Sequence, residues 1–221
     1  MTLVLLPGMM CDERLFQHMP PHSCLPITDH DTVEALAAEV LVNAPGTFAL
    51  AGLSMGGIVA MEVIAQAPDR VTQLCLMDTN AEAEADHIKA LRDPQITKAK
   101  AGHLRAVMRD EMKPNYLADG PNRQPVLDLC MDMALDLGPE VFVRQSRALA
   151  GRPDQKNTLR GWTKPTLILT GAEDRLCPLH RHTLMADLMP QATLTVIDGA
   201  GHLPTLEQPD ATRAAVEAWI G

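Results

Sequence analysis

Residues 48–57 read Phe-Ala-Leu-Ala-Gly-Leu-Ser-Met-Gly-Gly, in which an apolar run typical of a strand leads into a G-x-S-x-G pattern. Residues 58–67 then carry apolar side chains at helical spacing. A strand, a tight turn with serine at its apex and a helix form a nucleophile elbow, which holds the serine in a sparsely populated backbone conformation. Glycine suits positions 52 and 56 because side chains there would collide where helix and strand meet. The pattern predicts that Ser54 is an exposed nucleophile at a helix N-terminus; an incidental serine in a glycine-rich turn is the alternative.

Further short runs rich in Val, Leu and Ile, apolar on both faces, recur along the chain and predict strands covered by helices on both sides. With the run already quoted they are residues 2–6, 48–53, 71–77, 166–170 and 193–197, and the weaker segment 25–28 is a sixth candidate. Helical spacing is found at residues 32–42, 58–67, 180–189 and 211–220. Alternating strands and helices predict an α/β fold, a three-layer sandwich with a mostly parallel central sheet of about six strands.

The middle of the chain departs from this alternation. Residues 79–160 contain helical patterns and turn signals but no convincing strand run. We therefore expect a core domain made of residues 1–78 and 161–221, with residues 79–160 inserted as a helical cap. Such insertions usually cover the carboxyl ends of the strands, where ligands bind, although an insertion that only adds packing is the alternative.

Composition and charge exclude several classes of protein. The 221 residues are 46% hydrophobic and 21% charged, as in an ordinary folded domain. The 19 Lys and Arg against 28 Asp and Glu leave a net charge of −9, which repels phosphate backbones and anionic lipids, so we expect no nucleic-acid and no membrane partner. The apolar N-terminal run is too short to span a membrane. Five scattered cysteines without a C-x-x-C pair indicate a reducing, cytoplasmic location and no metal site.

A serine nucleophile needs a base, and the base needs an orienting acid. His202 lies on the loop after the last predicted strand, immediately before the last helix. Asp174, with Glu173 beside it, follows the strand predicted at residues 166–170. Asp78 ends another strand and is a second candidate for the acid. Because the carboxyl ends of parallel strands share one sheet edge, these side chains can meet Ser54 there.

The phrases GLSMGG, TGAEDRLCP and GAGHLPTLEQP resemble the elbow, acid loop and histidine loop of the α/β-hydrolase superfamily, and the likeness covers nearly the whole chain. It is similar to the small, cap-bearing serine carboxylesterases and lactonases of that family. The resemblance implies the catalytic set Ser54, Asp174 and His202. It also implies an oxyanion hole made by the backbone N–H groups of Met55 and of Met9 in the phrase LPGMM, where Pro7 replaces the family's usual histidine.

These features predict a cofactor-free serine hydrolase that cleaves a small-molecule carboxylic ester, with lactones and thioesters also open. Carbon–carbon bond hydrolysis, perhydrolysis and a slow-turnover ligand receptor on the same fold are the alternatives. The substrate and the oligomeric state are not indicated. Three other expectations concern polar residues. His180 and His182 lie on the surface, Arg147, Arg152 and Asp154 dock the cap, and Arg105, Arg109 and Arg144 are solvated or meet an anionic substrate.

Overall fold

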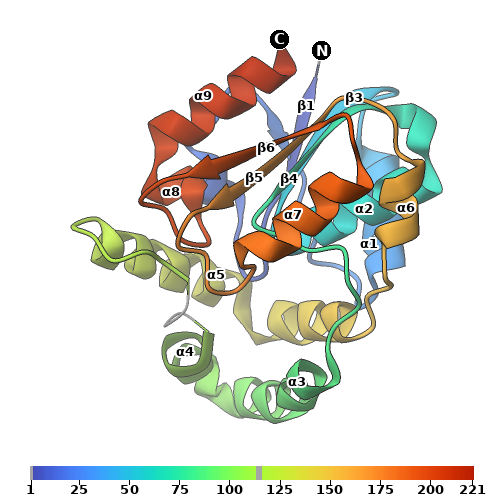
Figure 1. The fold of residues 1–221 in the computed structure, drawn as a ribbon. Coiled ribbons are helices and arrows are strands. Elements are labelled where there is room, and N and C mark those ends of the chain that lie inside the picture. The colour runs from blue at the N-terminus through green and yellow to red at the C-terminus, as the bar shows by residue number, and fades with distance from the viewer. Residues whose placement is uncertain (1, 113–115) are drawn as a thin grey trace.

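The computed structural model describes residues 2–112 and 116–221. Its six strands form one sheet in the order β2-β1-β3-β4-β5-β6, and every neighbouring pair is parallel (Figure 1). The strands are β1 (Leu3–Leu6), β2 (Ser23–Cys24), β3 (Phe48–Leu53), β4 (Val71–Met77), β5 (Thr166–Gly171) and β6 (Ala192–Ile197). The predicted fold class is therefore confirmed. The one misplaced strand is the weak candidate at residues 25–28, because β2 lies just before it.

Apolar residues on both faces of the central strands explain the three layers. Along β3, Phe48 and Leu50 belong to one hydrophobic core, whereas Ala49 and Ala51 belong to a second core on the opposite face. Successive side chains of a strand point to opposite faces, so a strand that is apolar throughout must be covered on both sides.

Helices cover the two faces. The first core is closed by α1 (Val33–Asn43), α2 (Met55–Gln66), α6 (Lys156–Gly161) and α7 (Leu179–Leu188), and the second by α8 (Pro204–Glu207), α9 (Pro209–Ile220) and a short 3₁₀ turn, Glu13–Phe16. The four helices predicted from sequence correspond to α1, α2, α7 and α9, and both ends of each lie within three residues of the predicted bounds. Helix α2 begins earlier than expected, directly after Ser54, because the turn itself forms its first helical residues.

Between β4 and β5 the described residues form helices and loops only. These are α3 (Asp86–Lys98), a π-helical turn (Ala99–His103), α4 (Leu104–Ala106), a second π-helical turn (Val107–Met112), α5 (Arg123–Ala150), which is broken at Gly138, and α6. Figure 1 shows α3, α4 and α5 gathered at the end of the sheet away from the two termini. Every residue of α3 is at least partly exposed. The division into a core and a cap stays a prediction.

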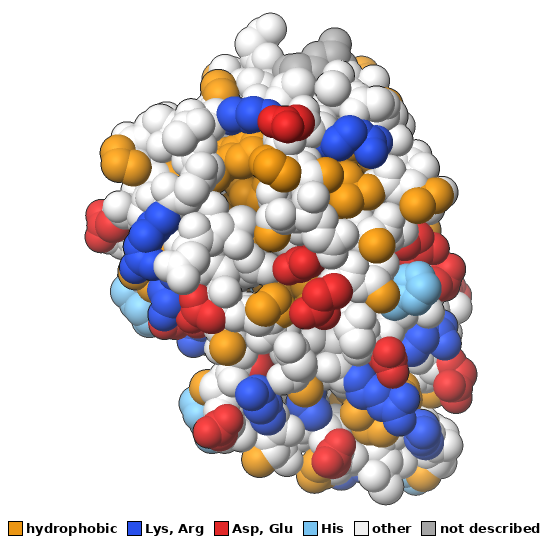
Figure 2. Space-filling model, turned by 90° about the vertical axis from the view of Figure 1, so that its right-hand side faces the viewer, with side chains coloured by type: hydrophobic (Ala, Val, Ile, Leu, Met, Phe, Trp, Pro, Cys, Tyr) orange, Lys and Arg blue, Asp and Glu red, His pale blue; other side chains and the backbone are white. Residues whose placement is uncertain are grey.

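The outer surface carries mixed chemistry. On the face that Figure 2 shows, acidic, basic and hydrophobic side chains are interspersed, so the net charge of −9 does not form a single field there. Within the described part of the chain, no helix combines the length and the apolar character that crossing a membrane requires.

Helix α2 packs against the sheet by direct backbone contact at two glycines. A Cβ atom on Gly56 would overlap the carbonyl oxygen of Leu6 in β1, and one on Gly52 would overlap the backbone of Gly56. The collision expected at these two positions is therefore present in the structure, and it joins the helix to β1 as well as to β3.

Replacing Gly56 with alanine should lower the free energy of unfolding by about 1–3 kcal/mol or more, because the new methyl group meets backbone that can move only with the sheet. Gly46→Ala is the matched control, since a Cβ there has no neighbour within 4 Å, and it should change stability by less than about 0.5 kcal/mol. Urea unfolding of both variants measures the difference. Equal stability of the two would contradict the close approach of α2.

Candidate active site

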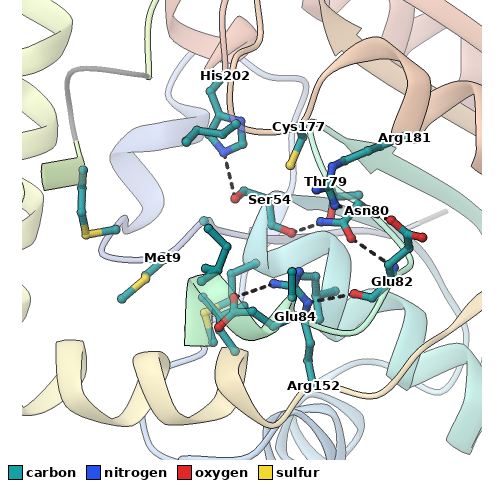
Figure 3. Close-up of a pocket in the computed structure, with 18 of the residues that line it drawn as sticks. Met9, Ser54, Thr79, Asn80, Glu82, Glu84, Arg152, Cys177, Arg181 and His202 are labelled. Carbon is teal, nitrogen blue, oxygen red and sulfur yellow. Dashed lines mark hydrogen bonds and ion pairs between the residues drawn. The ribbon is translucent and has the colours of Figure 1, made fainter. Parts of the chain in front are cut away.

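Ser54 stands at the turn between β3 and α2 with φ 55° and ψ −114°, a conformation outside the favoured regions for residues with a side chain. Its backbone is held from several directions. The Ser54 N–H donates to the Met77 carbonyl oxygen at 2.8 Å, and the Thr79 hydroxyl donates to the Ser54 carbonyl oxygen at 2.8 Å. These hydrogen bonds stabilise the strained turn. The turn points the Ser54 hydroxyl into a cavity (Figure 3).

The structure brings Ser54, His202 and Asp174 together in one chain of hydrogen bonds. His202 Nε2 lies 2.9 Å from Ser54 Oγ, and His202 Nδ1 lies 2.8 Å from Asp174 Oδ2. Asp174 and His202 are buried, with exposed fractions of 6% and 4%. Asp174 follows β5 and His202 follows β6, so the neighbouring strand ends place the acid beside the base.

The acid is held in its ionised form. Burial by itself raises the pKa of Asp174, but the charge and hydrogen bond of His202 and the N–H groups of Cys177 and Leu176 outweigh burial, so the pKa lies below its ordinary value. Those two N–H groups donate to Asp174 Oδ1 at 3.0 and 2.8 Å. A carboxylate accepts hydrogen bonds, so Nδ1 carries a proton whether His202 is charged or neutral, and in the neutral form Nε2 carries none. Nε2 is then free to accept from the Ser54 hydroxyl.

The two expected oxyanion donors lie on either side of Ser54. Met55 is the first residue of α2, and Gly8 brings the loop after β1 so close that a Cβ there would lie 3.5 Å from Ser54 Cβ. Within the described part of the chain, the N–H groups of Met9 and Met55 donate to no protein acceptor. Backbone N–H groups in that state can receive a developing negative charge. The Met10 N–H, by contrast, donates to Gln145 Oε1 at 2.8 Å.

Sequence reasoning missed the residues that hold the loops. Buried Gln145 of α5 ties the loop after β1 to the Ile27 carbonyl oxygen at 3.0 Å. The Glu207 carboxylate accepts from the N–H groups of Gly201, Leu203 and Ala118 at 3.0, 2.9 and 2.7 Å, and so fixes the loop that carries His202. In the sequence, the one signal for these contacts was Glu207 itself, a glutamate five residues after His202.

The two alternative acids have other surroundings. Glu173 is exposed. Asp78 is fully buried and accepts the Gly171 N–H at 2.9 Å through Oδ1. Burial first, and then the negative charge of Asp174, raise the pKa of Asp78 well above its ordinary value, so it is neutral where Asp174 is charged. Asp78 therefore supports the end of β5, and the carboxylate hydrogen-bonded to His202 is that of Asp174.

His182 corrects the expectation that both histidines of α7 are solvated. Its side chain is fully buried, and Nε2 accepts the Thr79 N–H at 3.1 Å. The histidine thereby holds the residue whose hydroxyl donates to the Ser54 carbonyl oxygen. Burial, despite the nearby charge of Asp174, lowers the pKa of His182 from 6.5 to about 4. Sequence could not reveal this, because the helix face that packs inward depends on the sheet.

A metal ion is one further occupant to consider. Asp174, Cys177 and His202 offer ligand atoms within 4.8 Å of one another. The carboxylate oxygens already accept hydrogen bonds from His202, Leu176 and Cys177. Burial also raises the pKa of the Cys177 thiol, and a protonated thiol is a poor metal ligand. The geometry favours the hydrogen-bonded arrangement over metal binding.

A cavity of about 550 Å³ opens in front of Ser54. Its wall carries both apolar and charged side chains. Met9, Ile58, Tyr116 and Leu149 are among its apolar residues, and Glu84, Arg92, Arg152 and Arg181 are among its charged ones. This volume suits a small molecule.

Comparison with known proteins gives consistent results. A family model described as the alpha/beta hydrolase family matches residues 4–215. The chain is 26% identical over 217 residues to a pimeloyl-(acyl-carrier protein) methyl ester esterase of Neisseria meningitidis serogroup C, covering 91% of this chain and 80% of that protein. It is 27% identical over 172 residues to 3-oxoadipate enol-lactonase 2 of Acinetobacter baylyi, covering 76% and 61%. Among solved structures, a malate-bound thermophilic esterase from Thermogutta terrifontis has a TM-score of 0.89 at 26% identity, covering 100% of this chain and 89% of that one.

The buried His182 predicts a pH dependence of stability. Between pH 6.5 and about 4 the unfolded chain binds a proton at this residue that the folded chain excludes, so the free energy of unfolding falls as the pH falls, by up to roughly 3 kcal/mol. In His182→Gln, whose amide oxygen can accept the Thr79 N–H, this contribution is absent. Urea unfolding at pH 7 and pH 4.5 measures it. If wild type and His182→Gln lose the same free energy of unfolding between pH 7 and pH 4.5, the inference that His182 is buried in its neutral form is wrong.

Proposed function

This chain belongs to the alpha/beta hydrolase family, and on that premise we propose that it is a serine hydrolase that cleaves carboxylic esters. The observation that carries the proposal is the hydrogen-bonded series Ser54, His202 and Asp174 at the wall of a cavity of about 550 Å³. The esterase and lactonase relatives act on the same bond type, which supports the assignment.

In the proposed mechanism Ser54 Oγ attacks the acyl carbon while His202 Nε2 accepts the hydroxyl proton. The negative charge that develops on the carbonyl oxygen is held by the N–H groups of Met9 and Met55. A single donor of this kind contributes about 10²–10³-fold to the rate of acyl transfer. His202 then delivers the proton to the leaving alcohol, and Asp174 stabilises the imidazolium. Water activated by His202 releases the acid and restores Ser54.

We assign a small or medium acyl ester as the substrate, with lactones and thioesters in the same class of reaction. The cavity volume and the apolar side chains of its wall support this size. The substrate is a small molecule, and the five cysteines, none of which forms a disulfide, are compatible with the proposed cytoplasmic location. The mechanism needs no cofactor or metal.

The first test is intact-mass spectrometry after treatment with a fluorophosphonate, together with turnover of p-nitrophenyl esters of increasing acyl length. Wild type should gain one adduct and hydrolyse short or medium esters, and Ser54→Ala should do neither while its thermal transition stays nearly unchanged. An adduct without turnover would indicate a receptor or another reaction on the same residues. A missing adduct would overturn the mechanism.

The two buried aspartates provide a matched pair of variants. Asp174→Asn should lower kcat by about 10³-fold or more, because the amide cannot stabilise the imidazolium or hold the required tautomer. Asp78→Asn should retain most of the activity, since an amide resembles the neutral carboxyl and its oxygen can still accept the Gly171 N–H. Steady-state ester kinetics measure both. The reverse order of effects would assign the acid to Asp78.

A further inference from the structure

At the wall of the cavity two guanidinium groups share one carboxylate, that of Glu84. Arg92 donates to Glu84 through Nε and Nη2 at 2.9 and 2.7 Å, and Arg152 Nη1 donates to the same carboxylate at 3.1 Å. All three side chains are largely buried, with exposed fractions of 12%, 10% and 2% for Arg92, Arg152 and Glu84. One negative charge therefore faces two positive charges in a poorly solvated place.

The other carboxylates of the cavity wall do not cancel this excess. Glu82 lies 3.6 Å from Lys156 and 3.8 Å from Arg181, so cations already surround it. Asp154 pairs with Lys156 at 3.0 Å, and Glu111 pairs with Lys98 at 2.7 Å. Burial lowers the pKa of Arg152; the charge of Glu84 opposes this shift, and the smaller contributions of Arg92 and Arg181 add to it. At Glu84 two guanidinium groups therefore meet one negative charge, although the whole chain carries a net charge of −9.

Several donors of these arginines have weak partners or none among the described residues. Arg92 Nη1 faces only the thioether sulfur of Met9, at 3.6 Å, and sulfur is a weak acceptor. Arg181 Nε is buried without a hydrogen-bond partner. A charged N–H in such surroundings gains most from an anionic acceptor. Planar guanidinium groups match the two oxygens of a carboxylate.

The position of the arginines relative to Ser54 indicates which part of a substrate they would meet. The Met9 backbone lies beside Ser54 as an oxyanion donor, and the Met9 side chain leads from there to Arg92. In Figure 3, Glu84 and Arg152 lie across Ser54 from His202. His202 protonates the leaving alcohol in the proposed mechanism, so the alcohol lies on the His202 side. The acyl chain then extends toward the arginines.

We propose that the cavity binds esters whose acyl chain ends in a carboxylate, held by Arg92 Nη1 together with Arg152. This inference rests on the proposed ester hydrolysis and names its substrate class, the monoesters of short dicarboxylic acids. It replaces the expectation for Arg105, Arg109 and Arg144, which do not line the cavity. Arg109 pairs with Asp110, and Arg144 donates to the Thr28 carbonyl oxygen.

A binding measurement tests the carboxylate site without turnover. Ser54→Ala is titrated with monomethyl glutarate and with methyl 5-methylhexanoate, a neutral ester of matched shape, by ligand-observed nuclear magnetic resonance. The carboxylate ester should bind about tenfold more tightly or better, because it accepts charge-assisted hydrogen bonds that the neutral ester cannot. Equal binding, or tighter binding of the neutral ester, would overturn the proposal.

Kinetics of the same two methyl esters, followed by chromatography of the acid product, provide the second test. The ratio of kcat/KM for the carboxylate ester to that for the neutral ester should fall about tenfold in Arg92→Gln. Arg92→Lys, which keeps the charge but not the planar group, should give an intermediate ratio. Arg109→Gln, an exposed arginine outside the cavity, should leave the ratio unchanged and is the matched control.

The outcomes separate this proposal from the one on which it rests. A wild-type ratio near one, or a ratio that Arg92→Gln does not change, overturns the carboxylate site and leaves ester hydrolysis standing. If wild type hydrolyses neither ester and takes up no fluorophosphonate, ester hydrolysis fails, and the binding comparison in Ser54→Ala decides the carboxylate site alone. If Arg92→Gln does not unfold cooperatively, Arg92→Lys takes its place in the kinetic comparison.

Discussion

The contact of helix α2 with the sheet through bare backbone is the constraint on which the site depends. Gly56 lies against the carbonyl of Leu6, and Gly52 against Gly56, with no room for a Cβ at either position. Because helix and strand lie so close, the chain turns sharply between them, and Ser54 at this turn has a positive φ. The close approach also sets the first N–H groups of α2 beside the loop after β1. The candidate nucleophile Ser54 and the two candidate oxyanion donors are thus placed by one packing contact.

A second constraint is the burial of charge at the carboxyl edge of the sheet. An ionised carboxylate away from water is tolerated only where hydrogen bonds replace its hydration. Asp174 has two backbone N–H groups and His202, and Glu207 has three N–H groups from the histidine loop and a neighbouring segment. Burial first, and then the negative charge of Asp174, raise the pKa of Asp78 well above its ordinary value, and the Asp78 carboxyl accepts the Gly171 N–H. The carboxylates of Asp174 and Glu207 each hold a loop in place, because the N–H groups that they accept belong to that loop.

Electrostatics differ between the whole molecule and the cavity. The chain carries a net charge of −9, which repels anions at long range. Inside the cavity two arginines share the Glu84 carboxylate, and their charge acts over a short distance where little water screens it. Recognition of an anion there would depend on contact geometry with the guanidinium groups. Long-range attraction would contribute little to the rate of association. Contact with the arginines would instead determine which substrates bind.

The sequence by itself determined the parallel sheet, the elbow at Ser54 and the loops that carry Asp174 and His202. Apolar periodicity, glycine spacing and turn residues act between neighbours in the chain, so these features can be read locally. Only the tertiary structure decided that His182 is buried against Thr79, that Gln145 and Glu207 tie the loops, and that Arg92 and Arg152 converge on Glu84. His182, Gln145, Glu207 and Arg92 lie on helices whose orientation is set by packing, whereas Thr79, Glu84 and Arg152 lie on the loops between elements. Several of the partners come from distant parts of the chain. A helix pattern shows which residues share a face, but the sheet and the neighbouring helices choose the face that turns inward.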